Sequence, residues 1–91
     1  MIMTTIVVGL VSDSCHECEE LRQRLTEAFF SRNIELEFVE VNYDDNPADS
    51  IESVSVLGLV EVPSFLIGGV IFTQYYNQSD LETAIENIRE E

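Results

Sequence analysis

The chain has 91 residues, which is the length of one domain, and we predict a single domain over residues 1–91. Hydrophobic residues make up 45% of the sequence, which excludes a disordered segment and allows a packed core. The 18 acidic residues face only four arginines and no lysine, and the resulting net charge of -14 excludes recognition of nucleic acid or of anionic membranes through a basic surface.

The first half of the chain alternates strand and helix patterns. Residues 6–11 form a continuous run rich in β-branched side chains, which predicts a strand buried on both faces. From Cys15 onward apolar residues recur at helical spacing, and residues 34–43 then predict a second strand. Pro47 suits the first turn of a second helix, which Gly58 ends. This alternation predicts parallel strands.

The second half of the chain predicts a hairpin followed by a helix. Residues 59–67 carry the third strand, Gly68 and Gly69 form a turn, and residues 70–76 form the returning strand. A capping box at residues 79–82 opens the last helix. The predicted order is β-α-β-α-β-β-α, an α/β fold with a four-stranded mixed sheet flanked by three helices.

The only two cysteines lie at the start of the first predicted helix. Ser14 and Glu17 fit a capping box, in which Ser14 is the N-cap residue and both side chains modulate the site. Cys15 then occupies the first helical position, where the helix dipole favours a thiolate, and Cys18 lies on the buried stripe. The spacing brings the two Cα atoms within disulfide range. An activated thiol beside a shielded one predicts a thiol–disulfide exchanger.

Cysteine usage and the N-terminus also predict the compartment. Two cysteines are too few for the disulfide framework of a small secreted domain. The apolar N-terminus has no basic segment and no cleavage site of small residues, and no apolar run is long enough for a membrane span. We therefore expect a cytoplasmic protein, in which a Cys-x-x-Cys pair is redox-active or binds a metal.

Four segments together resemble the thioredoxin-fold superfamily, in its glutaredoxin-like and short thioredoxin-like branches. These segments are the Cys15-His16-Glu17-Cys18 motif after the first strand, Val62-Pro63, Gly68-Gly69 at the hairpin, and Ser79-Asp80-Leu81 at the last helix. The resemblance covers nearly the whole chain and implies a thioredoxin fold. It also implies that Pro63 follows a cis peptide bond and faces Cys15, and that the backbone of Val62 binds the substrate chain.

The chain departs from both branches near the dithiol. Glutaredoxins have a basic residue before the first cysteine and a glycine pair after the hairpin. Both are absent here, so that only Ser79 and Asp80 are placed to receive the ends of glutathione. Thioredoxins have a buried aspartate where this chain has Gly9, and the lysine that partners it corresponds to Glu40. We hypothesise that Glu40 replaces the aspartate as proton acceptor for Cys18; the alternative is a solvated acid at a strand end.

The single histidine follows the first cysteine directly. A protonated His16 would stabilise the Cys15 thiolate and lies where substrate would bind. The alternative is an exposed residue with little effect. The neighbouring acids, Glu17 among them, oppose a thiolate, and solvent screening weakens each of them.

The leading functional hypothesis is a protein-disulfide reductase or glutaredoxin-like electron carrier, in which Cys15 attacks and Cys18 resolves. The expected substrates are protein disulfides, such as that of a ribonucleotide reductase, and the expected reductant is thioredoxin reductase or glutathione. We expect a monomer that binds neither nucleic acid nor membrane. No cofactor is expected beyond the redox-active disulfide, with bound glutathione left open.

Two alternatives come from other functional classes. Cys15, His16 and Cys18 could ligate a metal or an Fe-S cluster, although a structural zinc site needs four ligands. The chain could also be a redox-inert interaction module that docks to basic partners through its acidic surface. In that case replacement of Cys15 by serine would leave its function unchanged.

Overall fold

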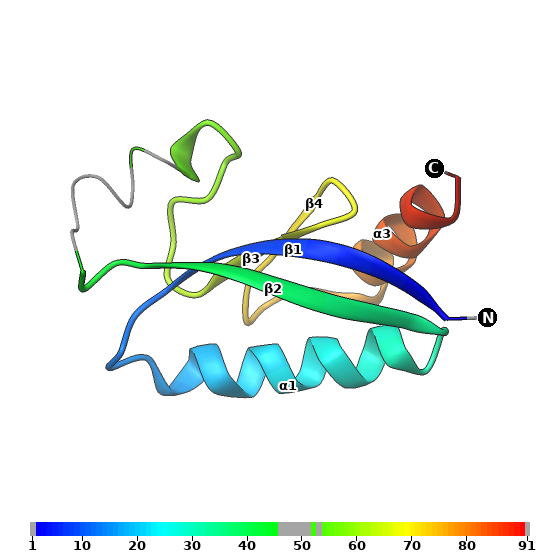
Figure 1. Cartoon of the computed structure of the whole chain (residues 1–91), viewed down its shortest axis with the longest axis horizontal. Coiled ribbons are helices and arrows are strands. Elements are labelled where there is room, and N and C mark those ends of the chain that lie inside the picture. The colour runs from blue at the N-terminus through cyan, green and yellow to red at the C-terminus, as the bar shows by residue number, and fades with distance from the viewer. Residues whose placement is uncertain (1, 46–51, 53, 91) are drawn as a thin grey trace.

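The computed structural model describes residues 2–45, 52 and 54–90 (Figure 1). Four strands and two helices lie within these residues. In chain order they are β1 (Met3–Val11), α1 (His16–Phe30), β2 (Ile34–Asn42), β3 (Ser64–Ile67), β4 (Val70–Phe72) and α3 (Gln78–Glu90). The predicted second helix, which starts at Pro47, lies mostly outside the described residues; of its described positions, Glu52, Val54 and Ser55 are helical.

The four strands form one mixed sheet in the order β2-β1-β3-β4. Strand β1 pairs with β2 in parallel and with β3 antiparallel, and β3 and β4 form an antiparallel hairpin. The hairpin turn places Gly68 and Gly69 at φ values of 56° and 78°, a region that side chains disfavour. The prediction of an α/β fold with a four-stranded mixed sheet is confirmed.

Two strands are shorter than the sequence predicts. Strand β3 begins at Ser64 rather than at residue 59, and Pro63 just before it has no N–H to donate to a strand ladder. Strand β4 ends at Phe72, because the chain then turns and the amide of Tyr76 donates to the carbonyl of Thr73 (3.1 Å). The residues before β3 and after β4 are therefore loops at one end of the sheet.

The main core lies between one face of the sheet and the two helices. Strand alternation directs Phe38 and Phe65 to this face, where their rings meet edge to face at 5.5 Å. Phe29 of α1 and Phe72 of β4 make a similar contact at 5.9 Å. The strands add Val7, Val11, Ile34 and Ile67 to this cluster, and helices α1 and α3 add Cys18, Leu21, Leu25, Leu81, Ala84, Ile85 and Ile88. Cys18 is therefore part of the core.

The opposite face of the sheet has a smaller core at one end. Leu10 of β1 packs there against Val54 and Leu59 from the segment that precedes β3. All three side chains are at least 98% buried. This segment lies above the sheet in Figure 1, whereas α1 lies below it.

The last helix begins earlier than predicted. The capping box at residues 79–82 is not formed; instead the amide of Asp80 donates to Asn77 Oδ1 (2.9 Å) and the amide of Asn77 donates to Asp80 Oδ2 (3.1 Å). This reciprocal pair has the same spacing as a Ser-x-x-Glu box, so Asn77 caps the helix and Ser79 lies inside it. Neither described helix is long and apolar enough to cross a membrane.

Candidate functional site

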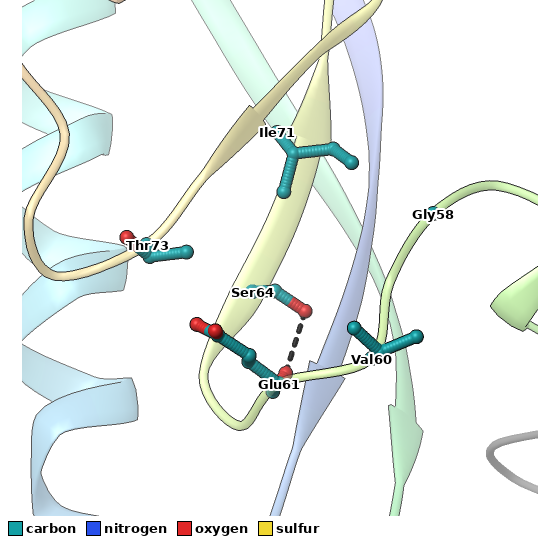
Figure 2. Close-up of a pocket in the computed structure, with 6 residues that line it drawn as sticks. All are labelled: Gly58, Val60, Glu61, Ser64, Ile71 and Thr73. Carbon is teal, nitrogen blue, oxygen red and sulfur yellow. Dashed lines mark hydrogen bonds between the residues drawn. The ribbon is translucent and has the colours of Figure 1, made fainter.

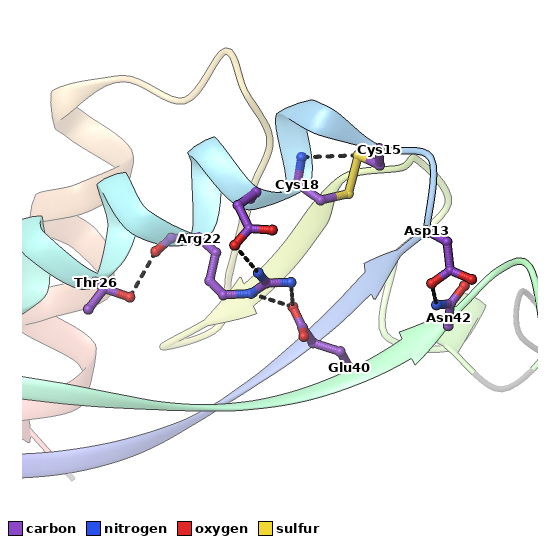
Figure 3. A network of polar contacts seen from close by, with 8 residues as sticks. Asp13, Cys15, Cys18, Arg22, Thr26, Glu40 and Asn42 are labelled. Atoms are coloured by element: carbon purple, nitrogen blue, oxygen red, sulfur yellow. Dashed lines mark hydrogen bonds and ion pairs between the residues drawn. A yellow bond between two sulfur atoms is a disulfide. The ribbon is translucent and has the colours of Figure 1, made fainter.

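The two cysteines form a disulfide across the first turn of α1 (Figure 3). Their Cα atoms are 5.3 Å apart, within the range that a disulfide tolerates. Cys18 is 3% exposed and belongs to the main core, whereas Cys15 is half-buried at its edge. The two sulfur atoms therefore differ in access to solvent, as the helical placement predicts.

The cap of α1 differs from the predicted one by one residue. Cys15, and not Ser14, is the N-cap residue, with extended backbone angles of −91° and 96°. The Cys15 Sγ atom accepts a hydrogen bond from the amide of Cys18 (3.0 Å), because the disulfide holds the sulfur over the first turn. The Ser14 hydroxyl instead contacts that of Ser12 (3.1 Å). Glu17 is exposed in the first turn and completes no capping box with Ser14.

This shift matters for the chemistry of the first sulfur. An atom at the N-cap position receives an amide hydrogen bond in addition to the field of the helix N-terminus. Both interactions favour a negative charge on Cys15 Sγ once the disulfide is reduced. Activation of Cys15 by the helix start stays a prediction, because the hydrogen bond is observed with the disulfide formed.

His16 extends along the surface of α1. Its side chain is 83% exposed, and its Nε2 atom lies 3.1 Å from Glu20 Oε1, one turn further along the helix. The contact with Glu20 holds the imidazole ring in solvent. Among the described residues, no hydrogen bond joins the His16 side chain to Cys15. A role of His16 in substrate binding stays a prediction.

A polar cleft of about 290 Å³ lies beside the disulfide. Arg22, one turn beyond Cys18 on α1, reaches across it to Glu40 on β2 (Figure 3). The Arg22 Nε and Nη2 atoms donate to Glu40 Oε2 at 2.9 and 2.7 Å. Arg22 was not predicted as a site residue, although its spacing of four from Cys18 places both side chains on one face of the helix. The other residues that line the cleft are Val11, Ser12, Asp13, Cys15, Glu19 and Asn42.

Glu40 lines the same cleft as Cys18, and its role as proton acceptor stays a prediction. Its register partner on β1 is Gly9, so the two residues are direct neighbours on the α1 face of the sheet. Any larger residue at position 9 would clash with Phe65, because an ideal Cβ on Gly9 would lie 2.5 Å from two atoms of its ring. The Glu40 side chain is 25% exposed and the residue as a whole is exposed, so the alternative of a solvated acid at a strand end stays open.

The loop before Cys15 is tied to the end of β2. Asn42 Nδ2 donates to Asp13 Oδ1 (2.6 Å), and the Asp13 amide donates to Asp44 Oδ2 (2.7 Å). The Asp44 amide in turn donates to Asn42 Oδ1 (2.9 Å). These bonds hold the rim of the cleft and bring further negative charge close to the dithiol.

The segment before β3 contains the proline that the resemblance predicts to follow a cis peptide bond. The Val62–Pro63 peptide bond is cis, which confirms that expectation. Pro63 is buried, Val62 is 38% exposed, and the Ser64 hydroxyl closes the loop on the carbonyl of Glu61 (2.7 Å; Figure 2). That Pro63 faces Cys15 and that the Val62 backbone binds substrate stay predictions.

The start of α3 contributes little that points to glutathione. The carboxylate of Asp80 is engaged in the helix cap with Asn77, and Ser79 is exposed in the first turn. Among the described residues, no hydrogen bond joins either side chain to the dithiol. Their role as receivers of glutathione therefore stays a prediction without structural support.

No protein-family model matches the chain, and no curated protein matches its sequence. Function must therefore be argued from the geometry of the site. In the part of the chain that the structure describes, no group of three or more His, Cys, Asp or Glu side chains is arranged to hold a metal ion.

Proposed function

We propose that the protein is a thiol–disulfide oxidoreductase that reduces protein disulfides. The observation that carries this proposal is the Cys15–Cys18 disulfide across the first turn of α1, with a half-buried first sulfur and a buried second one. A disulfide with one accessible sulfur accepts attack there, and after reduction the same sulfur is the nucleophile.

The reaction proceeds in two exchanges. The Cys15 thiolate attacks one sulfur of the substrate disulfide, so that an S–S bond forms to Cys15 and the other substrate sulfur leaves as a thiolate. The Cys18 thiol then loses its proton and attacks Cys15 Sγ, which breaks the mixed disulfide and releases the second substrate thiolate. Two electrons pass to the substrate, its two thiolates take up protons, and the protein is left as the Cys15–Cys18 disulfide.

The proposal includes a thioredoxin-type fold. Three features support it: the strand order β2-β1-β3-β4, the dithiol at the start of the helix after β1, and the cis proline just before β3. In this family the loop with the proline lies beside the dithiol. That loop passes near the start of α1 in both Figure 1 and Figure 3.

Glu40 is the proposed acceptor of the Cys18 proton. It lines the same cleft as Cys18, and both hydrogen bonds from Arg22 go to its Oε2 atom, which leaves Oε1 to take a proton. Arg22 fixes the carboxylate in place. It is therefore a positioning residue for the second exchange.

The proposed reductant is the dithiol of a reductase protein rather than glutathione. The cleft carries the carboxylates of Asp13, Glu19 and Glu40 against the single guanidinium of Arg22. Glutathione has two carboxylates and one ammonium group, so its net negative charge is repelled by this cleft. A reductase protein that presents a neutral or basic surface avoids this repulsion.

Redox titration of the purified protein tests the proposal. We expect a two-electron couple with a potential at or below that of the cytosolic glutathione pool, roughly −220 to −320 mV. Cys15→Ser should abolish reduction of a protein disulfide such as that of insulin, and Cys18→Ser should trap a mixed disulfide with it. Retention of full activity by Cys15→Ser would rule out the proposed function. Reduction of the oxidised protein by glutathione and by a thioredoxin reductase, compared side by side, tests the reductant.

A further inference from the structure

A row of apolar side chains crosses all four strands on the face of the sheet that does not carry the dithiol. Val8 is the register partner of both Val39 on β2 and Leu66 on β3, and Leu66 pairs with Ile71 on β4. Cross-strand partners point to the same side of a sheet, so these four side chains form one continuous line. We call these residues, together with Ile6 two positions before Val8, the apolar row.

The apolar row is open to solvent over most of its length. Ile6 is 61% exposed, Val39 51% and Ile71 40%, while Val8 and Leu66 are partly buried. These are large exposed fractions for apolar side chains in a sheet whose other face is fully covered by two helices. Surface hollows adjoin the row on both sides. One, of about 440 Å³, is lined in part by Ile6, Val8 and Leu66, and the other, of about 170 Å³, reaches Ile71.

Figure 2 shows the second hollow, with Ile71, Val60 and Glu61 around it. Val60 is 63% exposed and extends the apolar surface beyond the edge of the sheet. The small core around Leu10, Val54 and Leu59 packs against Val8 and Leu66 and so covers part of the centre of the row. The other three members, Ile6, Val39 and Ile71, remain largely exposed, whereas α1 and α3 pack on the opposite face.

The charges around the apolar row decide what can cover it. Glu35 and Glu37 alternate with Val39 on β2, so both carboxylates lie on the same face as the row, and both are exposed. Glu61 lines the hollow at the other end. A second copy of the chain would bring another net charge of -14 against these acids. A basic partner is favoured by the same charges.

We propose that the apolar row is a docking site for a basic amphipathic helix of another protein. An α/β sheet covers its apolar faces with helices, and in the part of the chain that the structure describes neither α1 nor α3 lies on this face. Four strands span about 14 Å across their axes, a length that roughly ten helical residues cover. Leucine-type side chains would meet the row, while lysine or arginine side chains would meet Glu35 and Glu37 at one end and Glu61 at the other.

This docking site is distinct from the dithiol. Val39 and Glu40 are consecutive residues of a strand, so their side chains point to opposite faces of the sheet. The cleft with the disulfide lies on the α1 face, and the apolar row lies behind it. A partner bound there leaves Cys15 accessible, so binding and disulfide exchange can be measured independently.

Titration with a synthetic peptide tests the proposal. The probe is a peptide of about 14 leucine and lysine residues whose leucines repeat at helical spacing, and the control peptide has the same composition in scrambled order. We expect the probe to shift the NMR signals of Ile6, Val8, Val39, Leu66 and Ile71 selectively. The double variant Val39→Ser/Ile71→Ser should weaken binding about tenfold or more, and disulfide reduction should be unchanged. The matched control Phe30→Ser removes an apolar side chain that is 55% exposed on α1 and should change the affinity by less than about twofold.

Several outcomes would overturn the proposal. Equal binding of the scrambled peptide, or shifts scattered over the acidic surface, would show attraction by net charge alone. Equal weakening by Phe30→Ser and by the double variant would show the same. A dimer in sedimentation experiments that the double variant dissociates would assign the row to a second copy of the chain. Circular dichroism of each variant establishes that it is folded before its affinity is compared.

Discussion

Replacement of Gly9 by alanine tests how the sheet makes room for the site. Gly9 lies in the centre of the sheet between Glu40 and Phe65, its register partners on β2 and β3. An ideal Cβ at this position would lie 2.5 Å from Cδ1 and Cε1 of the Phe65 ring, which is completely buried. The ring is held in turn by its edge-to-face contact with Phe38. It therefore has no free space into which to move.

The size of the expected effect follows from two opposing contributions. An additional methyl group in a packed core costs about 1–3 kcal/mol, because neighbouring side chains must leave their preferred rotamers. Alanine also loses less backbone entropy on folding than glycine, which offsets about 0.5–1 kcal/mol. Gly9 is not among the glycines with positive φ, so no strain in the backbone adds to the cost. We expect a net loss of about 1–2 kcal/mol in the free energy of unfolding.

Urea unfolding followed by circular dichroism measures this loss, which corresponds to a decrease of roughly 10 °C in Tm for a domain of this size. The double-mutant cycle with Phe65→Val identifies its cause, since valine lacks both ring atoms that the new methyl group would touch. In the Phe65→Val background Gly9→Ala should cost almost nothing. A clash with Phe65 is excluded if Gly9→Ala is as stable as the parent, or if its cost is the same in both backgrounds.

Three further predictions concern the site and the helix caps. Glu40→Gln should slow the second exchange several-fold near neutral pH and change the pH profile of disulfide reduction in stopped-flow measurements; an unchanged profile would show that Glu40 accepts no proton. Asn77→Ala should lower the free energy of unfolding by about 1 kcal/mol, whereas Ser79→Ala should change it by less than about 0.5 kcal/mol, and the reverse order in urea titrations would contradict the observed cap. Ser14→Ala should be similarly neutral, because Cys15 caps α1; a loss of about 1 kcal/mol would restore the predicted capping box.

Much of the site could be read from spacing along one element. The separation of Cys15 and Cys18 on a helix fixes which sulfur is exposed and which is buried, because it depends only on helical periodicity. The exact first residue of each helix was less predictable. Several residues near each helix start can serve as caps, and the choice between Ser14 and Cys15, or between Ser79 and Asn77, depends on which hydrogen bonds the surrounding chain permits.

The Arg22–Glu40 pair shows what local sequence cannot reveal. Its members are 18 positions apart, and they meet because β1 and β2 are parallel and α1 lies over that pair of strands. The lack of room for a side chain at Gly9 likewise comes from a third strand, since the Phe65 ring of β3 fills that position. Contacts of this kind depend on strand register and helix placement, which no periodicity in the sequence specifies.

The alternation of strands and helices, the position of the dithiol at a strand–helix junction and the strongly acidic charge are all visible in the sequence. These properties are local or additive, so composition and short-range spacing are enough to specify them. Folding is needed to bring a carboxylate from β2 to the dithiol cleft and to align apolar side chains from four strands on one face of the sheet. Both depend on strand register and on which faces other elements cover, and these are set by the packing of the whole domain.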